Sequence, residues 1–356
     1  MTRLKFQYWP ESAPAQMYVR DIQKMYQAGF AGCEFSRSKI REGKEKFSDH
    51  IDSQGTWSSS DGTDAAHEWG IAGSGVGKLS VPFLATLQLY PGCLPGPGQQ
   101  RGDCVSHGQK NANLISLCTE VLNEEPDDRT GTIEAAPEIS ADGIRNGALS
   151  TESIYWYRAH GGDGWFCGDS ARVSTTSAGC VVRRNYEDIG IDLTNYSGAL
   201  AGKYGRTSPP EVIGEVLNDH LIRTSTSLSS IEQIADFLHN GYGINSCGGE
   251  GFLLTRDENG VSKRSRSWSH SMAYIACDMR PWVQQVYNEP GLVLVQNSWG
   301  RFNNGPRRIK DTQYDIPEGS FWARWSDISR RSAYAMSSVN GWPAKKLPNY
   351  VPDGVV

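Results

Sequence analysis

The apolar residues after Cys104 recur at helical spacing. Val105, Ala112, Ile115, Cys118, Val121 and Leu122 fall near one face, and they predict a helix from Cys104 to about Asn123. The preceding loop, residues 91–98, is rich in Gly and Pro and excludes regular structure. Asp103 is a candidate N-cap for this helix. Cys104 is therefore expected in the first turn of a long helix.

Two further helices are predicted on either side of the middle of the chain. A helical run at residues 154–157 begins after Ser150 or Thr151. A second helix is expected from Ile231 to His239, with Ser229 and Glu232 as a capping box.

The C-terminal half shows the patterns of strands instead. Gly291–Gln296 is an unbroken apolar run and predicts a buried strand. Gly243–Phe252 is interpreted as a short strand that leads into a loop, and residues 256–260 as a hairpin turn. His270 is expected to open a strand, because it stands at the start of an apolar run.

Composition narrows the function classes. A chain of 356 residues is long enough for two domains or for one domain with extensions. The net charge of −5 gives no reason to expect a nucleic-acid partner. No stretch approaches the length of a membrane span, and residues 1–10 lack the apolar segment of a secretory signal. We therefore expect no membrane association and a cytoplasmic or virion-associated protein.

The eight cysteines are expected to be reduced thiols, because no secretory signal is visible and the chain is too long for a disulfide scaffold. No Cys-x-x-Cys pair indicates a structural zinc site. Cys118 and Cys277 lie in apolar runs and are expected in the core.

Cys104 is the candidate nucleophile. The positive end of a helix dipole stabilises a thiolate. A nucleophilic cysteine also needs a base and a group that orients the base. His270 and Asn297 are the candidates, and Asn297 begins the Asn-Ser-Trp-Gly segment after the predicted strand. Separately these residues have ordinary explanations, as a buried helix cysteine, a core histidine and a turn asparagine. Their order and context together favour catalysis.

The residues Cys104, His270 and Asn297–Gly300, in that order and context, resemble the papain-like cysteine peptidases. The resemblance covers roughly residues 90–330 and is most specific at Asn-Ser-Trp-Gly. It implies a papain-like α+β fold, in which a helical subdomain with the nucleophile helix faces a β-barrel-like subdomain. We expect an N-terminal extension at residues 1–78, a catalytic domain at 79–342 and a tail at 343–356.

The resemblance also implies an oxyanion hole made by the backbone N–H of Cys104 and a glutamine side chain. The family places that glutamine six residues before the cysteine, where this chain has Gly98. Gln99 and Gln100 are the substitutes, and Gln99 is preferred. The expected cleft-lining residues are His107, Gly161, Gly162, Cys247, Gly248, Gly249, Trp268 and Trp299. Trp299 is expected to shield the bond between His270 and Asn297.

His107 shares a helix face with Cys104. It is a second candidate partner for the thiol, and the two side chains are also a candidate metal pair. Two ligands are too few for a typical site, so no metal is expected, and the chemistry requires no cofactor.

Two interpretations of residues 1–78 stay open. Papain-like zymogens carry an inhibitory pro-segment, and an ordered arm that docks on the catalytic domain or on an assembly partner is the other. A helix is expected within Gln16–Ala28. Residues 72–80 resemble a phosphate-binding loop, but Ala72 and Leu79 stand where that motif needs Gly and Ser or Thr. A flexible junction is expected there.

The implied reaction is hydrolysis of peptide bonds in a polypeptide substrate through a thioester. An amidase or transamidase with the same residues is not distinguished by the sequence. The alternative from another class is a papain-like module with a structural or binding role in a virus particle or large assembly.

Overall fold

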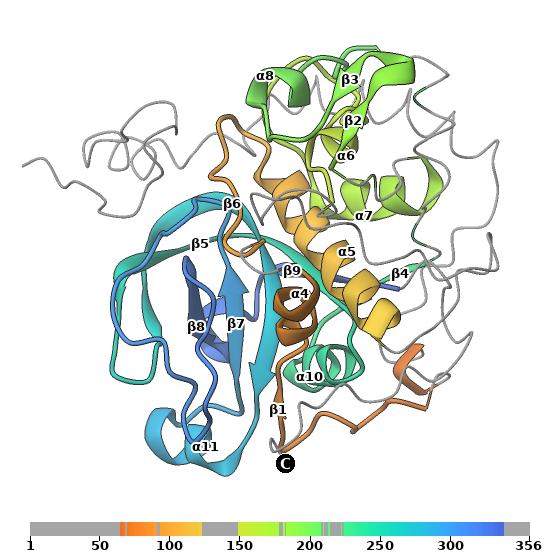
Figure 1. Ribbon diagram of the computed structural model, residues 1–356. Helices are drawn as coiled ribbons and strands as arrows, with labels where there is room; N and C mark the ends of the chain where they lie inside the picture. Colours follow the sequence, from red (N-terminus) through yellow and green to blue (C-terminus); the bar gives the residue numbers. More distant parts are fainter. Residues whose placement is uncertain are drawn as a thin grey trace, which may run out of the picture.

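The chain combines a helical part with a curled antiparallel sheet (Figure 1). The computed structural model describes residues 65–67, 70–90, 93–122, 149–177, 181, 183–207, 209, 213, 222 and 224–337. The helix expected at Gln16–Ala28 and the tail at 343–356 lie outside these residues. The expected α+β fold class is confirmed.

The described helices differ widely in length. The longest, α5, runs from Cys104 to Leu122 and lies between the sheet and the remaining helices of the upper part (Figure 1). The others are α4 (Phe83–Leu89), α6 (Glu152–Tyr155), α7 (Cys167–Thr176), α8 (Gly198–Ala201), α10 (Ile231–His239), α11 (Pro281–Tyr287), α12 (Trp325–Ile328) and the 3₁₀ turn η1 (Glu187–Ile189).

The main sheet is antiparallel, with the strand order β4-β9-β5-β6-β7-β8 and β1 paired to β6. Its strands are β1 (Leu79–Ser80), β4 (Ser225–Leu228), β5 (Ile244–Arg256), β6 (Ser262–Asp278), β7 (Leu292–Gln296), β8 (Ser320–Arg324) and β9 (Ser332–Met336). A small separate sheet pairs β2 (Asn185–Tyr186) with β3 (Ile191–Asp192). Strands β5 and β6 are long and carry register shifts, and such bulges bend and twist a sheet.

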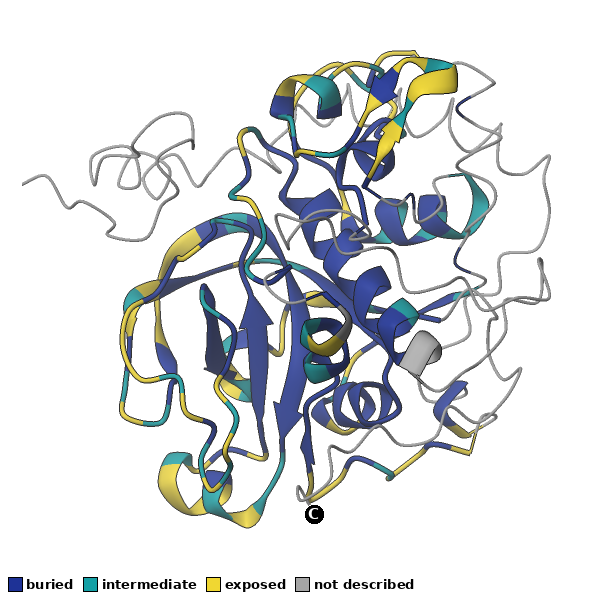
Figure 2. Cartoon of the chain, in the orientation of Figure 1, coloured by how far each residue is buried: buried dark blue, intermediate teal, exposed yellow. Residues whose placement is uncertain are grey.

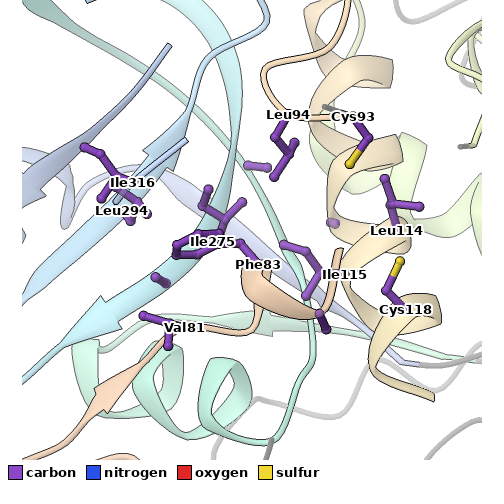
Figure 3. Close-up of a cluster of buried hydrophobic side chains, with 14 of the residues drawn as sticks. Val81, Phe83, Cys93, Leu94, Leu114, Ile115, Cys118, Ile275, Leu294 and Ile316 are labelled. Atoms are coloured by element: carbon purple, nitrogen blue, oxygen red, sulfur yellow. The ribbon is translucent and has the colours of Figure 1, made fainter. Parts of the chain in front are cut away.

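Both faces of the central strands are covered, which explains their unbroken apolar runs. On β7, Leu292 and Leu294 join the core under α4 and α5, whereas Val293 and Val295 join the core under α10. The first core is shown in Figure 3, where Phe83, Ile115 and Ile275 lie between the helices and the sheet. The buried colour of α5 and of the central strands in Figure 2 shows the same arrangement.

Helix predictions held better than strand predictions. The helices at Cys104–Leu122, Glu152–Tyr155 and Ile231–His239 are confirmed. The predicted capping box is wrong by one residue, because the first helical residue is Ile231 and the N-cap is therefore Ser230, paired with Gln233.

The strand predictions need two corrections. The segment predicted as a short strand and loop is the continuous thirteen-residue strand β5. His270 does not open its strand but lies in the middle of β6, which begins at Ser262. Residues that are Gly-rich in β5 and mostly polar in β6 extend the two strands, because the bulged ladder pairs them with each other. The buried strand at Leu292–Gln296 is confirmed.

Described residues before β1 pack onto the sheet domain. Ala65, Ala66 and Ile71 belong to the core under α10. The loop at residues 72–78 is held in place, not a flexible junction, since the carboxylate of Asp236 accepts the backbone N–H groups of Gly73 and Gly75, each at 2.8 Å. The carboxylate of Asp236 thus accepts backbone N–H groups that, in a phosphate-binding loop, would bind a phosphate.

The contact between α5 and β5 predicts a large effect of one methyl group. A Cβ at Gly243 would lie 2.0 Å from the carbonyl oxygen of Ala112 on α5. Gly243→Ala should lower the free energy of unfolding by about 3 kcal/mol, measured by urea unfolding. Gly249→Ala is the matched control, because its Cβ would meet only the carbonyl oxygen of Trp268 at 3.7 Å. Equal stability of the two variants would contradict the described packing.

Candidate active site

The start of α5 places Cys104 at a helix N-terminus inside the protein. The carbonyl of Asp103 accepts the N–H groups of Ser106 and His107, which makes Asp103 the N-cap position. Its side chain has a different partner, because Oδ2 accepts the Tyr196 hydroxyl at 2.7 Å. Cys104 is fully buried.

His270 is held by its neighbours on the β6 side of the site. Its Nε2 lies 2.9 Å from Oδ1 of Asn297, the first residue after β7. The ring stacks on Trp299 at 4.6 Å between centroids, and Trp268 approaches it edge-on at 6.0 Å. Because an amide oxygen only accepts, the bond to Asn297 puts the proton of the neutral ring on Nε2. Nδ1 is then the basic nitrogen, and it is buried with no hydrogen-bond partner among the described residues.

Close packing brings the start of α5 to the strand that carries His270. The amide of Asn245 on β5 donates to the carbonyl of Val105 at 3.4 Å, and the hydroxyl of Ser271 on β6 donates to the same asparagine at 2.8 Å. A Cβ at Gly108 would lie 2.4 Å from Oδ1 of Asn245, so only glycine permits this approach. The immediate neighbours of Cys104 and of His270 therefore belong to one contact region.

The surroundings of His270 favour its neutral form. Burial lowers the pKa of His270 to about 3, the Asn297 hydrogen bond opposes this, and the nearby Arg331 cation adds to it. A charged imidazole in this place would need an anion close by. In the chemistry expected from the sequence, the thiolate of Cys104 would be this anion.

The two candidate glutamines lie in different places. Gln99 bridges to the segment after β7, since its N–H donates to the carbonyl of Ser298 at 2.8 Å and its side-chain oxygen accepts the Ser298 hydroxyl. Its side-chain nitrogen donates to the carbonyl of Arg101 at 2.8 Å. Gln100 is exposed, and its side-chain oxygen accepts the N–H of Gly198 at 2.9 Å. Gln99 therefore lies beside the Asn297 segment, and Gln100 lies toward α8.

His107 lies within the helical part. It is buried, packs against Tyr196 at 4.9 Å between centroids, and its Nε2 lies 3.6 Å from Oδ1 of Asp103. Burial lowers its pKa well below the ordinary value. Burial also raises the pKa of Asp103 to about 7, against the opposing hydrogen bond from Tyr196. The pair is therefore largely uncharged in mildly acidic solution.

The expectation of reduced thiols is wrong for one pair. Cys167, the first residue of α7, is joined to Cys247 on β5 by a disulfide. The pair lies next to the candidate site, because Cys247 is opposite Ser271 in the β5–β6 ladder and the Cys167 sulfur lies 3.4 Å from the Ser271 hydroxyl. Eighty residues separate the two cysteines along the chain, so no local pattern announces the bond. Cys93, Cys104, Cys118 and Cys277 take part in no disulfide, and the expected burial of Cys118 and Cys277 is confirmed.

The other predicted cleft residues spread over both parts of the fold. Gly161 and Gly162 are exposed, and Gly162 accepts the Arg158 side chain at 3.0 Å. Gly164 of the same loop donates to the carbonyl of Gly102 at 2.7 Å, which ties the loop to the start of α5. On β5, Gly248 lies opposite His270 in the ladder, and Gly249 is exposed.

Sequence reasoning missed Arg331, Glu250 and Cys167, all of which lie close to His270 or its strand. Arg331 donates to the carbonyl of His270 at 2.7 Å and lies beside Glu250 at 3.4 Å. Neither charge stands out in the sequence, because Arg331 follows Arg330 and Glu250 lies among glycines. Within the described part of the chain, no three His, Cys, Asp or Glu side chains gather as a metal site would require. The same part contains no helix that is long and apolar enough to cross a membrane.

The comparisons with known proteins add structural likenesses. No protein-family model and no curated protein matches the sequence. Xylellain, a cysteine protease from Xylella fastidiosa, is 12% identical with a TM-score of 0.42, over 74% of this chain and 86% of its own. Digestive procathepsin L 3 of Tenebrio molitor is 13% identical with a TM-score of 0.38, over 92% of this chain and 94% of its own.

The fold is papain-like. A cysteine at the start of a central helix, a histidine on a strand of the facing sheet and an asparagine after the next strand carry this conclusion. The similarity scores by themselves do not carry it, because they are low.

The ragweed Amb a 11 cysteine protease, in its proform, has a TM-score of 0.37 at 12% identity, over 68% of this chain and 61% of its own.

The buried Asp103 carboxyl predicts a pH dependence of stability. Between about pH 4 and 7 the folded carboxyl keeps a proton that the unfolded one has lost, so stability falls as the pH rises. In Asp103→Asn, the fall in the free energy of unfolding from pH 5 to pH 8 should be smaller by about 2 kcal/mol. Urea unfolding of both proteins at pH 5 and pH 8 measures this difference in the free energy of unfolding.

Asp192→Asn is the control for this experiment. Asp192 is exposed and hydrogen bonds from Thr194 lower its pKa, so it stays ionised over the same range. An unchanged pH dependence in Asp103→Asn would mean that the buried carboxyl is not protonated in the folded chain.

Proposed function

We propose that this protein hydrolyses peptide bonds in a polypeptide through a thioester on Cys104, with His270 as base and Asn297 as the orienting residue. The observation that carries the proposal is the bond from His270 Nε2 to Asn297 Oδ1 at 2.9 Å, which leaves the buried Nδ1 without a described partner. This nitrogen belongs to the region where β6 meets the start of α5. The papain-like fold supports cysteine peptidase activity in general. The roles of the three residues and the cleavage of internal peptide bonds are proposed beyond this general activity.

The proposed reaction has two stages. The thiolate of Cys104 attacks the carbonyl carbon, and the imidazolium of His270 gives its proton to the leaving amine as the C–N bond breaks. Water then attacks the thioester while His270 accepts its proton, and the C–S bond breaks to release the acid and restore the thiol pair. The dipole of α5 and the thiolate's pairing with His270 stabilise the reactive charges.

Two groups are proposed to hold the oxyanion. The first N–H groups of a helix have no partner within the helix, and that of Cys104 is one of them. Gln99 is the proposed second donor, because its side chain lies at Ser298 while Gln100 binds Gly198. Trp299, stacked on His270, is proposed to keep water from the bond to Asn297.

A second function rests on one observation. Cys104, His270 and Asn297 are all 0% exposed, so a substrate has no direct access to them in this state. A module with a structural or binding role in a virus particle or large assembly is consistent with such burial. A pro-segment within the extension at residues 1–78 would explain the same burial in an enzyme. An amidase or transamidase with the same three residues is a variant of the first proposal.

The location and the partners are proposed from the sequence. We propose a cytoplasmic or virion-associated protein that acts on a polypeptide, without nucleic-acid or membrane partners. An assembly partner, if present, is proposed to bind through the extension at residues 1–78.

Labelling with a peptide epoxide that alkylates catalytic thiolates tests the proposed triad. A single adduct on Cys104 at mildly acidic pH is expected by peptide mass, because among the described cysteines outside the disulfide it is the one at a helix start packed against the strand of His270. Cys104→Ala should abolish peptide hydrolysis, and His270→Ala should abolish labelling. Asn297→Ala should slow both less than His270→Ala does, because Asn297 acts through the histidine.

The outcomes separate the proposals. Labelling that survives in His270→Ala would remove the histidine from the proposed role. No labelling of the full chain, but labelling after deletion of residues 1–64, would support a pro-segment. This deletion keeps the packed residues Ala65, Ala66 and Ile71. No labelling of either form would favour the structural role.

The glutamine assignment has its own test. Gln99→Ala should lower kcat by about a hundredfold or more, as expected for loss of an oxyanion donor. Gln100→Ala, next in sequence and turned toward Gly198, should change kcat by less than about threefold. A larger loss in Gln100→Ala would transfer the role to that residue.

A further inference from the structure

A buried arginine lies beneath the strand that carries His270. Arg331 precedes β9, and its side chain is 0% exposed. Its guanidinium donates to the carbonyl of His270 at 2.7 Å and to the carbonyl of Ser246 at 3.2 Å. A third bond, at 3.4 Å, reaches the carbonyl of Glu250. One side chain therefore binds main-chain atoms of both β5 and β6.

The position of these bonds explains why a guanidinium is needed. The β5–β6 ladder pairs Gly248 with His270 and then shifts register before Glu250. A bulge leaves a residue unpaired, and a buried carbonyl without a donor is costly. The planar fork of an arginine can serve several such carbonyls at once, whereas an ammonium has no fixed fork. Arg331 thus adds a side-chain bond to the main chain of His270 at the last ladder pair before the register shift.

The charges around His270 are few and come from three elements. Arg331 lies beside β9, and its partner Glu250 on β5 approaches it at 3.4 Å. On α5, His107 is buried and largely neutral, and Cys104 is the proposed thiolate. The cation of Arg331 disfavours a second positive charge on the ring. The carboxylate of Glu250, beside Arg331, is expected to offset part of this effect.

We propose that Arg331 is a positioning residue for His270, which holds its main chain and, together with Glu250, sets the pH range over which the imidazole keeps its proton. This rests on the proposed function, in which His270 is the acid and base. The two parts of the proposal make different predictions. The hydrogen bonds affect the rate, and the charge affects the pH dependence.

The test compares the pH profiles of epoxide labelling of Cys104 in the full chain. Arg331→Gln removes the cation, so the high-pH loss of labelling should move up by about one pH unit. Glu250→Gln removes the offsetting anion, so the high-pH limb of the profile, where labelling is lost, should move to lower pH. The double variant Arg331→Gln with Glu250→Gln should return the limb toward that of the unchanged protein. It also serves as the folded variant if either single change fails to fold.

Arg331→Lys is the matched control for geometry. It keeps the charge but loses the fork, so the limb should stay in place while the labelling rate falls about tenfold. A merely structural arginine would lower thermal stability in all variants and leave the limb unmoved. Shifts of the same sign in Arg331→Gln and Glu250→Gln would also overturn the proposal.

A direct readout separates this proposal from the proposed function. In Cys104→Ala, which needs no activity, NMR of the His270 ring should show its titration moving to higher pH when Arg331→Gln is added. An unmoved titration refutes the role of Arg331. A moved titration in a protein that is never labelled would uphold the role of Arg331 and refute the peptidase.

Discussion

Everything at the candidate site depends on how closely α5 approaches the sheet. Gly108 and Gly243 leave no room for a side chain between the helix and the strands, and Asn245 crosses the contact to reach the carbonyl of Val105. A helix held at this distance cannot shift without breaking buried hydrogen bonds. The start of α5 and the middle of β6 are thereby fixed relative to each other. The packing of α5 against the sheet therefore also positions the candidate residues.

Polar side chains are buried in this interior, and three of them have clear partners. Asp103 is held by Tyr196, His270 by Asn297, and Arg331 by three carbonyls and Glu250. Burial moves the pKa of Asp103 up and that of His270 down, so both groups tend to the neutral form. A site built this way keeps little permanent charge at rest. Charge separation between a thiol and an imidazole would then be the main electrostatic event there.

The sequence predicted the elements whose signals are local. The helix at Cys104 has a Gly- and Pro-rich loop before it and a clear apolar face, and β7 is a continuous apolar run, so both were predicted within two residues. The order of Cys104, His270 and Asn297 was enough to predict the fold. The full length of β5 was not predictable, because its glycines and serines are strand residues only through their neighbours. Arg331 and the Cys167–Cys247 pair depend on contacts between distant parts of the chain, which no short pattern records.

The bond between Cys167 and Cys247 adds a second sulfur chemistry to the one proposed for Cys104. It fastens the first residue of α7 to β5, opposite Ser271 and one residue from the ladder partner of His270. A nucleophilic thiol works only when reduced, whereas this link exists only when oxidised. Strong reductants would preserve the first and cut the second, and strong oxidants would do the reverse. The protein is complete only between these extremes, so the redox potential of its surroundings helps to define its native state.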